Sequence, residues 1–326
     1  MSEFAKAACA SIAATAVALL ALPPRPAAAQ ASDYPSRKVT FVVGFAPGGG
    51  IDTMARIVAQ GLGDRFGYQI VVENRPGAAS NIAAKVVASA SPDGYTLLFA
   101  GNSLAINQTF YKNLTYSIDQ LQAVAVAAID SQALAINAGR PARTLAEFLD
   151  AARGASFTFG YGGSSAHIVA EYVLKVLAKS PAIGVPFQSG APTITALLGN
   201  HVDIIAGPVA EVYPQAQQGA LRALAVTGAR RAQAFPEVPT LSETGFPGLE
   251  INGWVGLLAP AKMPPEISAK LNAAVNAVVA EPAIDKRLRE TGYEPTAMPV
   301  SGAAAVLKTS IEKWGRMLEA TGITAE

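Results

Sequence analysis

Sulfur and imidazole chemistry is nearly absent from this sequence. Of its 326 residues, one is cysteine and two are histidine. Cys9 lies near the amino terminus, so the rest of the chain has no thiol and can form no disulfide. We expect no transition-metal site, because the usual ligands are missing. Stability must therefore come from a hydrophobic core, and the chain is 51% hydrophobic.

Charge is scarce and balanced. Charged residues make up 15% of the chain, and the formal net charge is +1. Without Lys6, Arg25 and Glu3, which lie in the first 29 residues, basic and acidic residues are equal in number. A neutral chain offers no electrostatic attraction for nucleic acid or for an anionic membrane surface. We therefore expect neither as a partner.

Residues 1–31 have the pattern of a secretory signal peptide. Lys6 precedes an apolar stretch over residues 7–22, prolines end that stretch, and Ala27-Ala28-Ala29 offers a small-residue cleavage site. We expect cleavage near Ala29 or Ala31. The alternative is a retained membrane anchor, which the length disfavours because a spanning helix needs about 20 apolar residues.

A glycine-rich turn follows the first apolar run of the mature chain. Val39–Val43 has no polar alternation, which predicts a strand buried on both faces. After Pro47-Gly48-Gly49-Gly50, apolar residues recur at spacings of three and four, as on one face of a helix: Met54, Ile57, Val58 and Leu62. The glycines thus lie where a helix presents unpaired N–H groups, which favours anion binding. The alternative is a purely structural turn; the motif is neither a P-loop nor a dinucleotide fingerprint.

The strand–helix alternation occurs twice, which predicts an α/β fold with two lobes and a cleft between them. We expect residues 32–130 to form the first part of lobe 1 and residues 131–224 to form lobe 2. Residues 225–326 then return to lobe 1 with the C-terminal helices. The last helix carries an apolar stripe that includes Leu307, Trp314 and Leu318, and we expect this stripe to pack on lobe 1.

Ligands of open α/β sheets bind beyond the carboxyl ends of the strands, so the turns there are the candidate site. These turns span residues 45–52, 101–103, 160–167, 187–192 and 206–209. They contain no lysine or arginine, and Asp52 and His167 are their ionisable residues. No serine hydrolase motif and no carboxylate pair for acid–base catalysis can be identified. A cleft of neutral donors predicts a binding protein without a cofactor, rather than an enzyme.

Several ordered motifs resemble the substrate-binding proteins of tripartite tricarboxylate transporters, the Bug or TctC-like family. The resemblance covers essentially the whole mature chain. Its motifs are Phe45-Ala46-Pro47-Gly48-Gly49-Gly50 followed by Asp52, Val72-Glu73-Asn74-Arg75-Pro76-Gly77-Ala78, Pro92-Asp93-Gly94-Tyr95-Thr96-Leu97-Leu98, Leu221-Arg222-Ala223-Leu224-Ala225-Val226-Thr227, and Gly256-Leu257-Leu258-Ala259-Pro260.

This resemblance implies a type-2 periplasmic binding protein whose two lobes are joined by crossover strands. It implies a monomer that binds a small organic acid through backbone N–H groups and hydroxyls and interacts with membrane permease subunits. The ligand-binding residues that the turns and the resemblance together predict are Phe45, Gly48, Gly49, Gly50, Ile51, Asp52, Asn102, Ser103, Tyr161, Gly163, Ser164, Ser165, His167, Phe187, Ser189, Gly190, Ala191, Gly207 and Pro208.

Three departures from the family pattern bear on the ligand. Ile51 replaces a hydroxyl residue, Phe187-Gln188-Ser189 lacks the usual lysine, and Ala206-Gly207-Pro208 lacks the usual aspartate. The missing aspartate disfavours an amino-acid ligand. We expect a carboxylate with an apolar body, such as terephthalate or a medium-chain dicarboxylate, rather than citrate.

Three other functions stay open at this point. The same scaffold could present its ligand to a sensor kinase, and neighbouring genes would distinguish sensing from transport. A carboxylate-acting lyase or hydrolase would turn over a bound acid. An inert α/β domain would show no ligand-dependent stabilisation.

Overall fold

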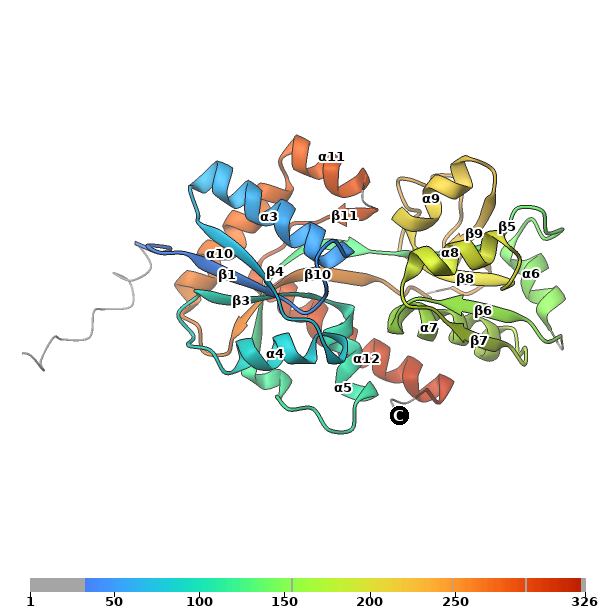
Figure 1. Cartoon of the computed structure of the whole chain (residues 1–326), viewed down its shortest axis with the longest axis horizontal. Coiled ribbons are helices and arrows are strands. Elements are labelled where there is room, and N and C mark those ends of the chain that lie inside the picture. The colour runs from blue at the N-terminus through green and yellow to red at the C-terminus, as the bar shows by residue number, and fades with distance from the viewer. Residues whose placement is uncertain (1–32, 154, 248, 291, 324–326) are drawn as a thin grey trace, which may run out of the picture.

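The computed structural model describes residues 33–323, apart from residues 154, 248 and 291, and has two α/β lobes (Figure 1). The expected signal peptide, residues 1–31, lies outside the described residues. Within the described range, no helix has both the length and the apolarity that a membrane crossing requires. The two-lobed α/β arrangement predicted from the alternating pattern is confirmed.

Lobe 1 is built on a six-stranded sheet with the order β11-β4-β10-β3-β1-β2. The first three strands pair in parallel, whereas β4, β10 and β11 are antiparallel to their neighbours. The strands are β1 (Val39–Val43), β2 (Ile70–Asn74), β3 (Thr96–Gly101), β4 (Leu121–Asp130), β10 (Gly253–Pro260) and β11 (Tyr293–Pro295). The helices are α3 (Gly50–Phe66), α4 (Asn81–Ala88), α5 (Asn102–Phe110), α10 (Pro265–Val279) and α11 (Pro282–Glu290).

Strand β1 contacts a hydrophobic core on each face of this sheet. Val39, Phe41 and Val43 belong to one core, and Val42 belongs to the other. All four side chains are at most 2% exposed. This double burial confirms the prediction from the unalternating apolar run and places the end of β1 in the middle of the lobe.

Lobe 2 has a five-stranded sheet with the order β7-β6-β8-β5-β9. Strand β6 is parallel to β7 and β8, and β5 is antiparallel to β8 and β9. The strands are β5 (Gln132–Asn137), β6 (Thr158–Tyr161), β7 (Ile183–Pro186), β8 (Ile204–Pro208) and β9 (Leu221–Val226). The helices are α6 (Leu145–Ala152), α7 (Ser164–Glu171), which continues into a π-helical turn (Tyr172–Leu177), α8 (Gly190–Leu198) and α9 (Val209–Gln217).

Two backbone segments connect the lobes. Only Ser131 separates the end of β4 from the start of β5, and residues 227–252 lead from β9 back to β10. In the returning segment, Leu241 and Ile251 lie in the core of lobe 2. Because the expected boundary after residue 224 falls inside β9, we propose that the chain returns to lobe 1 at β10 instead.

Helix α12 (Val300–Thr321) extends along both lobes (Figure 1). Leu307 contacts a core of lobe 1, as expected. Trp314 and Leu318 belong to a core that lobe 2 shares with α5 of lobe 1, so the stripe packs on lobe 1 as expected and also on lobe 2. Helical periodicity identifies the apolar face of a helix, but it cannot identify the partner of each turn.

We predict that Trp314→Ala lowers the free energy of unfolding by about 3–5 kcal/mol, because Trp314 is 1% exposed and its loss leaves a cavity. Trp314→Phe should cost only about 1–2 kcal/mol, since Nε1 of Trp314 has no hydrogen-bond partner among the described residues. Urea unfolding measures both values, with exposed Glu319→Ala as the control on the same helix. Equal losses for Trp314→Ala and Trp314→Phe would contradict this packing.

Candidate ligand-binding cleft

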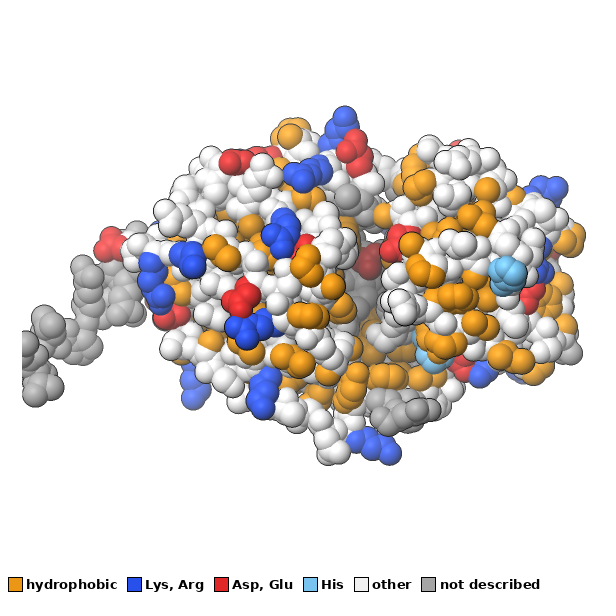
Figure 2. Space-filling view, in the orientation of Figure 1, with side chains coloured by type: hydrophobic (Ala, Val, Ile, Leu, Met, Phe, Trp, Pro, Cys, Tyr) orange, Lys and Arg blue, Asp and Glu red, His pale blue; other side chains and the backbone are white. Residues whose placement is uncertain are grey.

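A cavity of about 540 Å³ lies between the lobes, and Figure 2 shows the hollow with acidic side chains beside it. Its walls come from the glycine turn before α3, from the starts of α9 and β11, and from the end of β4. The lining residues are Phe45, Gly48, Gly49, Gly50, Ile51, Thr53, Asp130, Gly162, Pro208, Ala210, Glu211, Glu290, Gly292 and Tyr293.

A second cavity of about 130 Å³ lies within lobe 2 and shares Gly162, Pro208 and Glu211 with the cleft. It is bordered by the amino ends of α7, α8 and α9, which the sequence had predicted to form strand-end turns. Its other lining residues are Gln132, Gly163, Ser165, Ala166, Gly190, Thr193, Ile194, Ile205, Ala206 and Gly207.

The helix starts that border the two cavities have no side-chain caps. In the described structure, none of the helices α3, α7, α8 and α9 has an N-cap side chain that accepts a hydrogen bond from its first turn. By contrast, Thr144 caps α6 by accepting a hydrogen bond from the Glu147 backbone N–H, at 3.2 Å, as its sequence predicts. Uncapped first turns present N–H groups and the positive end of the helix dipole, which suits an anionic ligand.

The glycine turn is held from behind by Asp52. Its carboxylate accepts hydrogen bonds from the Gly48 backbone N–H at 2.8 Å, from Arg56 Nε at 2.9 Å and from Asn74 Nδ2 at 2.8 Å. Asn74 also donates to the Phe45 carbonyl at 2.9 Å. The hydrogen bond from Arg56 is the main reason that the pKa of Asp52 falls from 3.8 to about 2. Asp52 is 1% exposed, so we assign it a positioning role rather than the predicted ligand contact.

Two glycines of this turn meet specific steric demands. Gly48 has a φ of +83°, which side-chain-bearing residues rarely adopt. A Cβ on Gly50 would lie 2.6 Å from Tyr293 Oη, so the absence of a side chain lets this hydroxyl reach the turn. Burial raises the pKa of Tyr293, which keeps the phenol protonated and able to donate a hydrogen bond.

Two carboxylates that the sequence analysis did not select face the cleft. Asp130 ends β4, and Glu211 lies in the first turn of α9. Neither has a hydrogen bond or an ion pair with any residue that the structure describes. Burial and the nearby Glu211 raise the pKa of Asp130 from 3.8 to about 7, and burial also raises that of Glu211. The expectation of a cleft with only neutral donors is therefore wrong.

The carboxylate of Glu211 lies over the amino end of α8. Its Oε2 occupies the space that a Cβ on Gly190 would take. The helix dipole favours a negative charge at this position. Gly190 therefore leaves room for Glu211, and this contact brings α8 and α9 together beside the smaller cavity.

Tyr161 and His167 form a stack beside the cleft instead of lining it. Their ring centroids are 3.9 Å apart and the planes differ by 5°. Nε2 of His167 is 3.8 Å from Glu171, and burial lowers the pKa of His167, so it is neutral near pH 7. These contacts hold the His167 ring within lobe 2, away from the lining of both cavities.

Ten of the predicted residues lie on the walls of the two cavities: Phe45, Gly48, Gly49, Gly50, Ile51, Gly163, Ser165, Gly190, Gly207 and Pro208. The others do not line them: Asp52, Asn102, Ser103, Tyr161, Ser164, His167, Phe187, Ser189 and Ala191. Asp130 was not among the predicted residues, although it follows the apolar run of residues 121–129 and so lies at a strand end like the others. No comparable pattern in the sequence indicates Glu211 or Tyr293.

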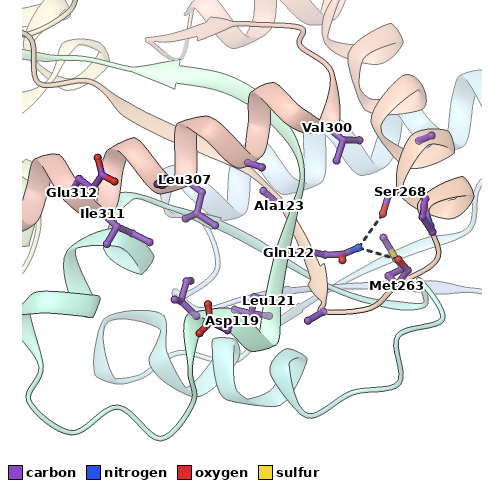
Figure 3. A pocket seen from close by; sticks show the side chains of 16 residues that line it. Asp119, Leu121, Gln122, Ala123, Met263, Ser268, Val300, Leu307, Ile311 and Glu312 are labelled. Carbon is purple, nitrogen blue, oxygen red and sulfur yellow. Dashed lines mark hydrogen bonds between the residues drawn. The ribbon is translucent and has the colours of Figure 1, made fainter.

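A larger cavity, of about 890 Å³, lies in lobe 1 between α10, α12 and the start of β4 (Figure 3). The Gln122 side chain lines part of this cavity, and its Nε2 donates hydrogen bonds to Ser268 Oγ at 3.0 Å and to the Met263 carbonyl at 3.3 Å. Apolar side chains such as Leu307 line the rest. This cavity is lined by no glycine-rich turn and by no residue of lobe 2, so the interlobe cleft is the better candidate.

Comparison with known proteins finds relatives along most of the chain. The model of the tripartite tricarboxylate transporter family receptor matches residues 54–323. The "UPF0065 protein in tcbD-tcbE intergenic region" of Pseudomonas sp. strain P51 is 32% identical over 291 residues, which cover 87% of this chain and 86% of that protein.

Two solved structures are similar over their full length. R. palustris Rpa4515 with adipate has a TM-score of 0.78 at 30% identity, and the match covers 90% of this chain and 99% of that chain. MatC from Rhodopseudomonas palustris with bound malate has a TM-score of 0.73 at 30% identity, with 87% of this chain and 100% of that chain covered.

We predict that Asp52→Asn destabilises the protein by about 2 kcal/mol at pH 7, because the charge-assisted hydrogen bonds are lost. The folded pKa of Asp52, about 2, lies below the ordinary value of 3.8. The contribution of Asp52 is therefore present above pH 3.8 and is lost as the pH falls through 2. Urea unfolding at pH 7 and pH 3 tests this, with exposed Asp64→Asn on the same helix as the control. A loss that is independent of pH would contradict the assignment.

We predict the opposite sign for Asp130. Its folded pKa, about 7, lies above 3.8, so its ionisation disfavours the folded state increasingly as the pH rises towards 7. Asp130→Asn should therefore gain stability over the wild type by about 1–3 kcal/mol more at pH 8 than at pH 5. Urea unfolding at both pH values measures the difference, and exposed Asp119→Asn should show none. A constant difference between wild type and Asp130→Asn would mean that Asp130 is ordinarily solvated.

Proposed function

This chain belongs to the tripartite tricarboxylate transporter receptor family, and from that premise we propose that it captures a small organic carboxylate in its cleft and delivers it to the membrane subunits of such a transporter. The family resemblance read from the sequence and the type-2 binding-protein fold are confirmed. Members of this family are periplasmic substrate-binding proteins and not enzymes. The signal-like pattern of residues 1–31 supports a periplasmic location for this chain.

The observation that carries this proposal is the set of uncapped helix starts around the interlobe cavity and the smaller cavity that adjoins it. The amino end of α3 points towards lobe 2 (Figure 1), and the glycines before it share a cavity with Gly162, Pro208 and Glu211 of lobe 2. Backbone N–H groups at such ends can hold a carboxylate without a lysine or arginine. A ligand that contacts both walls would favour the conformation in which the two lobes enclose it.

The ligand that we propose has an apolar body. Phe45 and Ile51 border the glycine turn, and Ile51 offers a hydrocarbon surface where the family pattern has a hydroxyl. Adipate, bound in one related structure, has a chain of methylene groups between its carboxylates. An aromatic or medium-chain acid such as terephthalate or adipate therefore fits this wall better than citrate, whose hydroxyl and third carboxylate would face hydrocarbon.

The test is a thermal-shift screen of about a hundred organic acids with the mature protein, followed by calorimetry of the hits. A ligand at 100 times its Kd should add about 2.7 kcal/mol to the free energy of unfolding. We expect hits among apolar-bodied carboxylates. Stabilisation by citrate alone would contradict the proposed ligand, and no hit among the acids would contradict the proposed function.

We predict that Gly163→Ala weakens binding of any such hit by about tenfold or more without destabilising the protein. A Cβ on Gly163 would contact nothing within 4 Å, so the fold accommodates it, but the methyl group would enter the cavity at the start of α7. Gly63→Ala, which lies in the last turns of α3, is the matched control and should leave the Kd unchanged. Unchanged binding by Gly163→Ala would exclude the start of α7 from the site.

A further inference from the structure

We propose that the captured acid carries a nitrogen hydrogen-bond donor, an ammonium or a primary amide, at the end remote from its carboxylate, and that Asp130 and Glu211 accept hydrogen bonds from this donor. The inference rests on the proposed function, because it takes the glycine turn as the carboxylate site. It deepens that function by assigning the opposite wall of the same cleft. It also narrows the proposed ligand: the carboxylate and the apolar body stay, and a nitrogen donor replaces the second carboxylate of terephthalate or adipate.

The two ends of the cleft have opposite chemistry. The glycine turn offers backbone donors, and Tyr293 Oη stands beside Gly50 as a further donor. On the other wall, the side chains of Asp130 and Glu211 are acceptors. No lysine or arginine lines either cavity in the described part of the chain, so the protein itself supplies no cation to this wall.

Gln132 provides an independent observation. This side chain is 6% exposed and lines the smaller cavity together with Glu211. Its Nε2 donates to Ser165 Oγ at 3.0 Å, but its Oε1 has no hydrogen-bond partner among the described residues. Buried acceptors of native proteins are nearly always paired, so an unpaired one beside a cavity indicates a missing donor. The cleft wall and the adjoining smaller cavity together therefore hold three acceptor side chains without a side-chain or backbone donor among the described residues.

A second free carboxylate on the ligand does not suit this wall. It would face Asp130 and Glu211, and like charges at close range disfavour binding. An ammonium would relieve the repulsion between the two protein carboxylates, and an amide would satisfy an acceptor without adding charge. The sequence alone disfavoured an amino-acid ligand, because the turn at Ala206-Gly207-Pro208 lacks an aspartate. The structure reopens this class, since Asp130 supplies a carboxylate from the crossover strand.

The experiment compares ligands of equal length that differ at one end. Calorimetry at pH 7.5 would titrate α,ω-dicarboxylates of four to eight carbons, the matching ω-amino acids, the monoamides and the methyl-ended monocarboxylates. At the best length, we expect the ω-amino acid or the monoamide to bind about tenfold or more tightly than the dicarboxylate and the methyl-ended acid. The amino and amide arms distinguish the two donor types.

Variants test which residues set this preference. Asp130→Asn and Glu211→Gln should each reduce the preference for the ω-amino acid over the dicarboxylate by roughly tenfold. Glu312→Gln, in the separate cavity of lobe 1, is the control and should leave the preference unchanged. Thermal unfolding of each variant checks that it folds. Because Asp130 lies on β4 and Glu211 on α9, one variant still tests the preference if the other does not fold.

The pH dependence gives a second readout. Asp130 faces Glu211 on α9 and Tyr293, its partner in the β4–β11 register, and Glu290 on α11 lines the same cavity. As the pH rises from 6 to 8, ionisation of Asp130 should strengthen binding of an ω-amino acid and weaken that of a dicarboxylate. The two ligand classes should therefore show opposite slopes.

The outcomes separate the two proposals. If dicarboxylates bind tightest and Asp130→Asn has no effect, the donor inference is overturned and carboxylate capture stands. If binding requires an added divalent cation, the wall holds a metal and not a nitrogen donor, which also overturns the inference. If no organic acid in either screen binds, carboxylate capture itself fails.

Discussion

The backbone N–H groups at the starts of four helices are the constraint on which this site depends. Right-handed strand–helix units place these starts at the carboxyl ends of the strands, so both lobes present them to the same opening. Two carboxylates of the chain itself lie against these turns: Asp52 accepts a hydrogen bond from the Gly48 backbone N–H, and the carboxylate of Glu211 lies over the start of α8. The other backbone N–H groups at these helix starts are available to an anionic ligand from solution.

The β4–β5 connection between the lobes places Asp130 at the cleft. Strand β4 ends at Asp130 and β5 begins at Gln132, so the crossover passes through the floor of the cleft. The register of β11 sets Tyr293 directly opposite Asp130. Helix α12 adds a further link, since Leu307 belongs to a core of lobe 1 and Trp314 to the core that lobe 2 shares with α5. Any motion of one lobe against the other must therefore strain β4–β5 or shift α12.

Local sequence patterns were sufficient to predict helices, strands and turns, but they did not predict which side chains line the cleft. The double burial of Val42 and its neighbours, the Gly48 turn and the Thr144 cap each follow from a pattern within a few residues. Glu211 and Tyr293 join the site through pairings between distant segments, which no local pattern encodes. His167 shows the opposite error: its position in a turn indicated a ligand contact, whereas Tyr161 stacks on it.

A chain with almost no net charge can still have an acidic cleft, because its basic residues can pair with other acidic residues away from the cleft. The arginines nearest the site are already engaged: Arg56 binds Asp52 behind the glycine turn, and Arg289 binds Asp285 at 2.7 Å and 3.0 Å. These pairs leave Asp130 and Glu211 without a partner cation on the cleft wall. Asp130 is half-buried and Glu211 is exposed on the cleft wall. Holding two carboxylates near each other without a partner cation costs stability, and a binding protein gains from that cost only when its ligand removes it. The acidic wall is thus better explained by ligand selection than by the stability of the ligand-free fold.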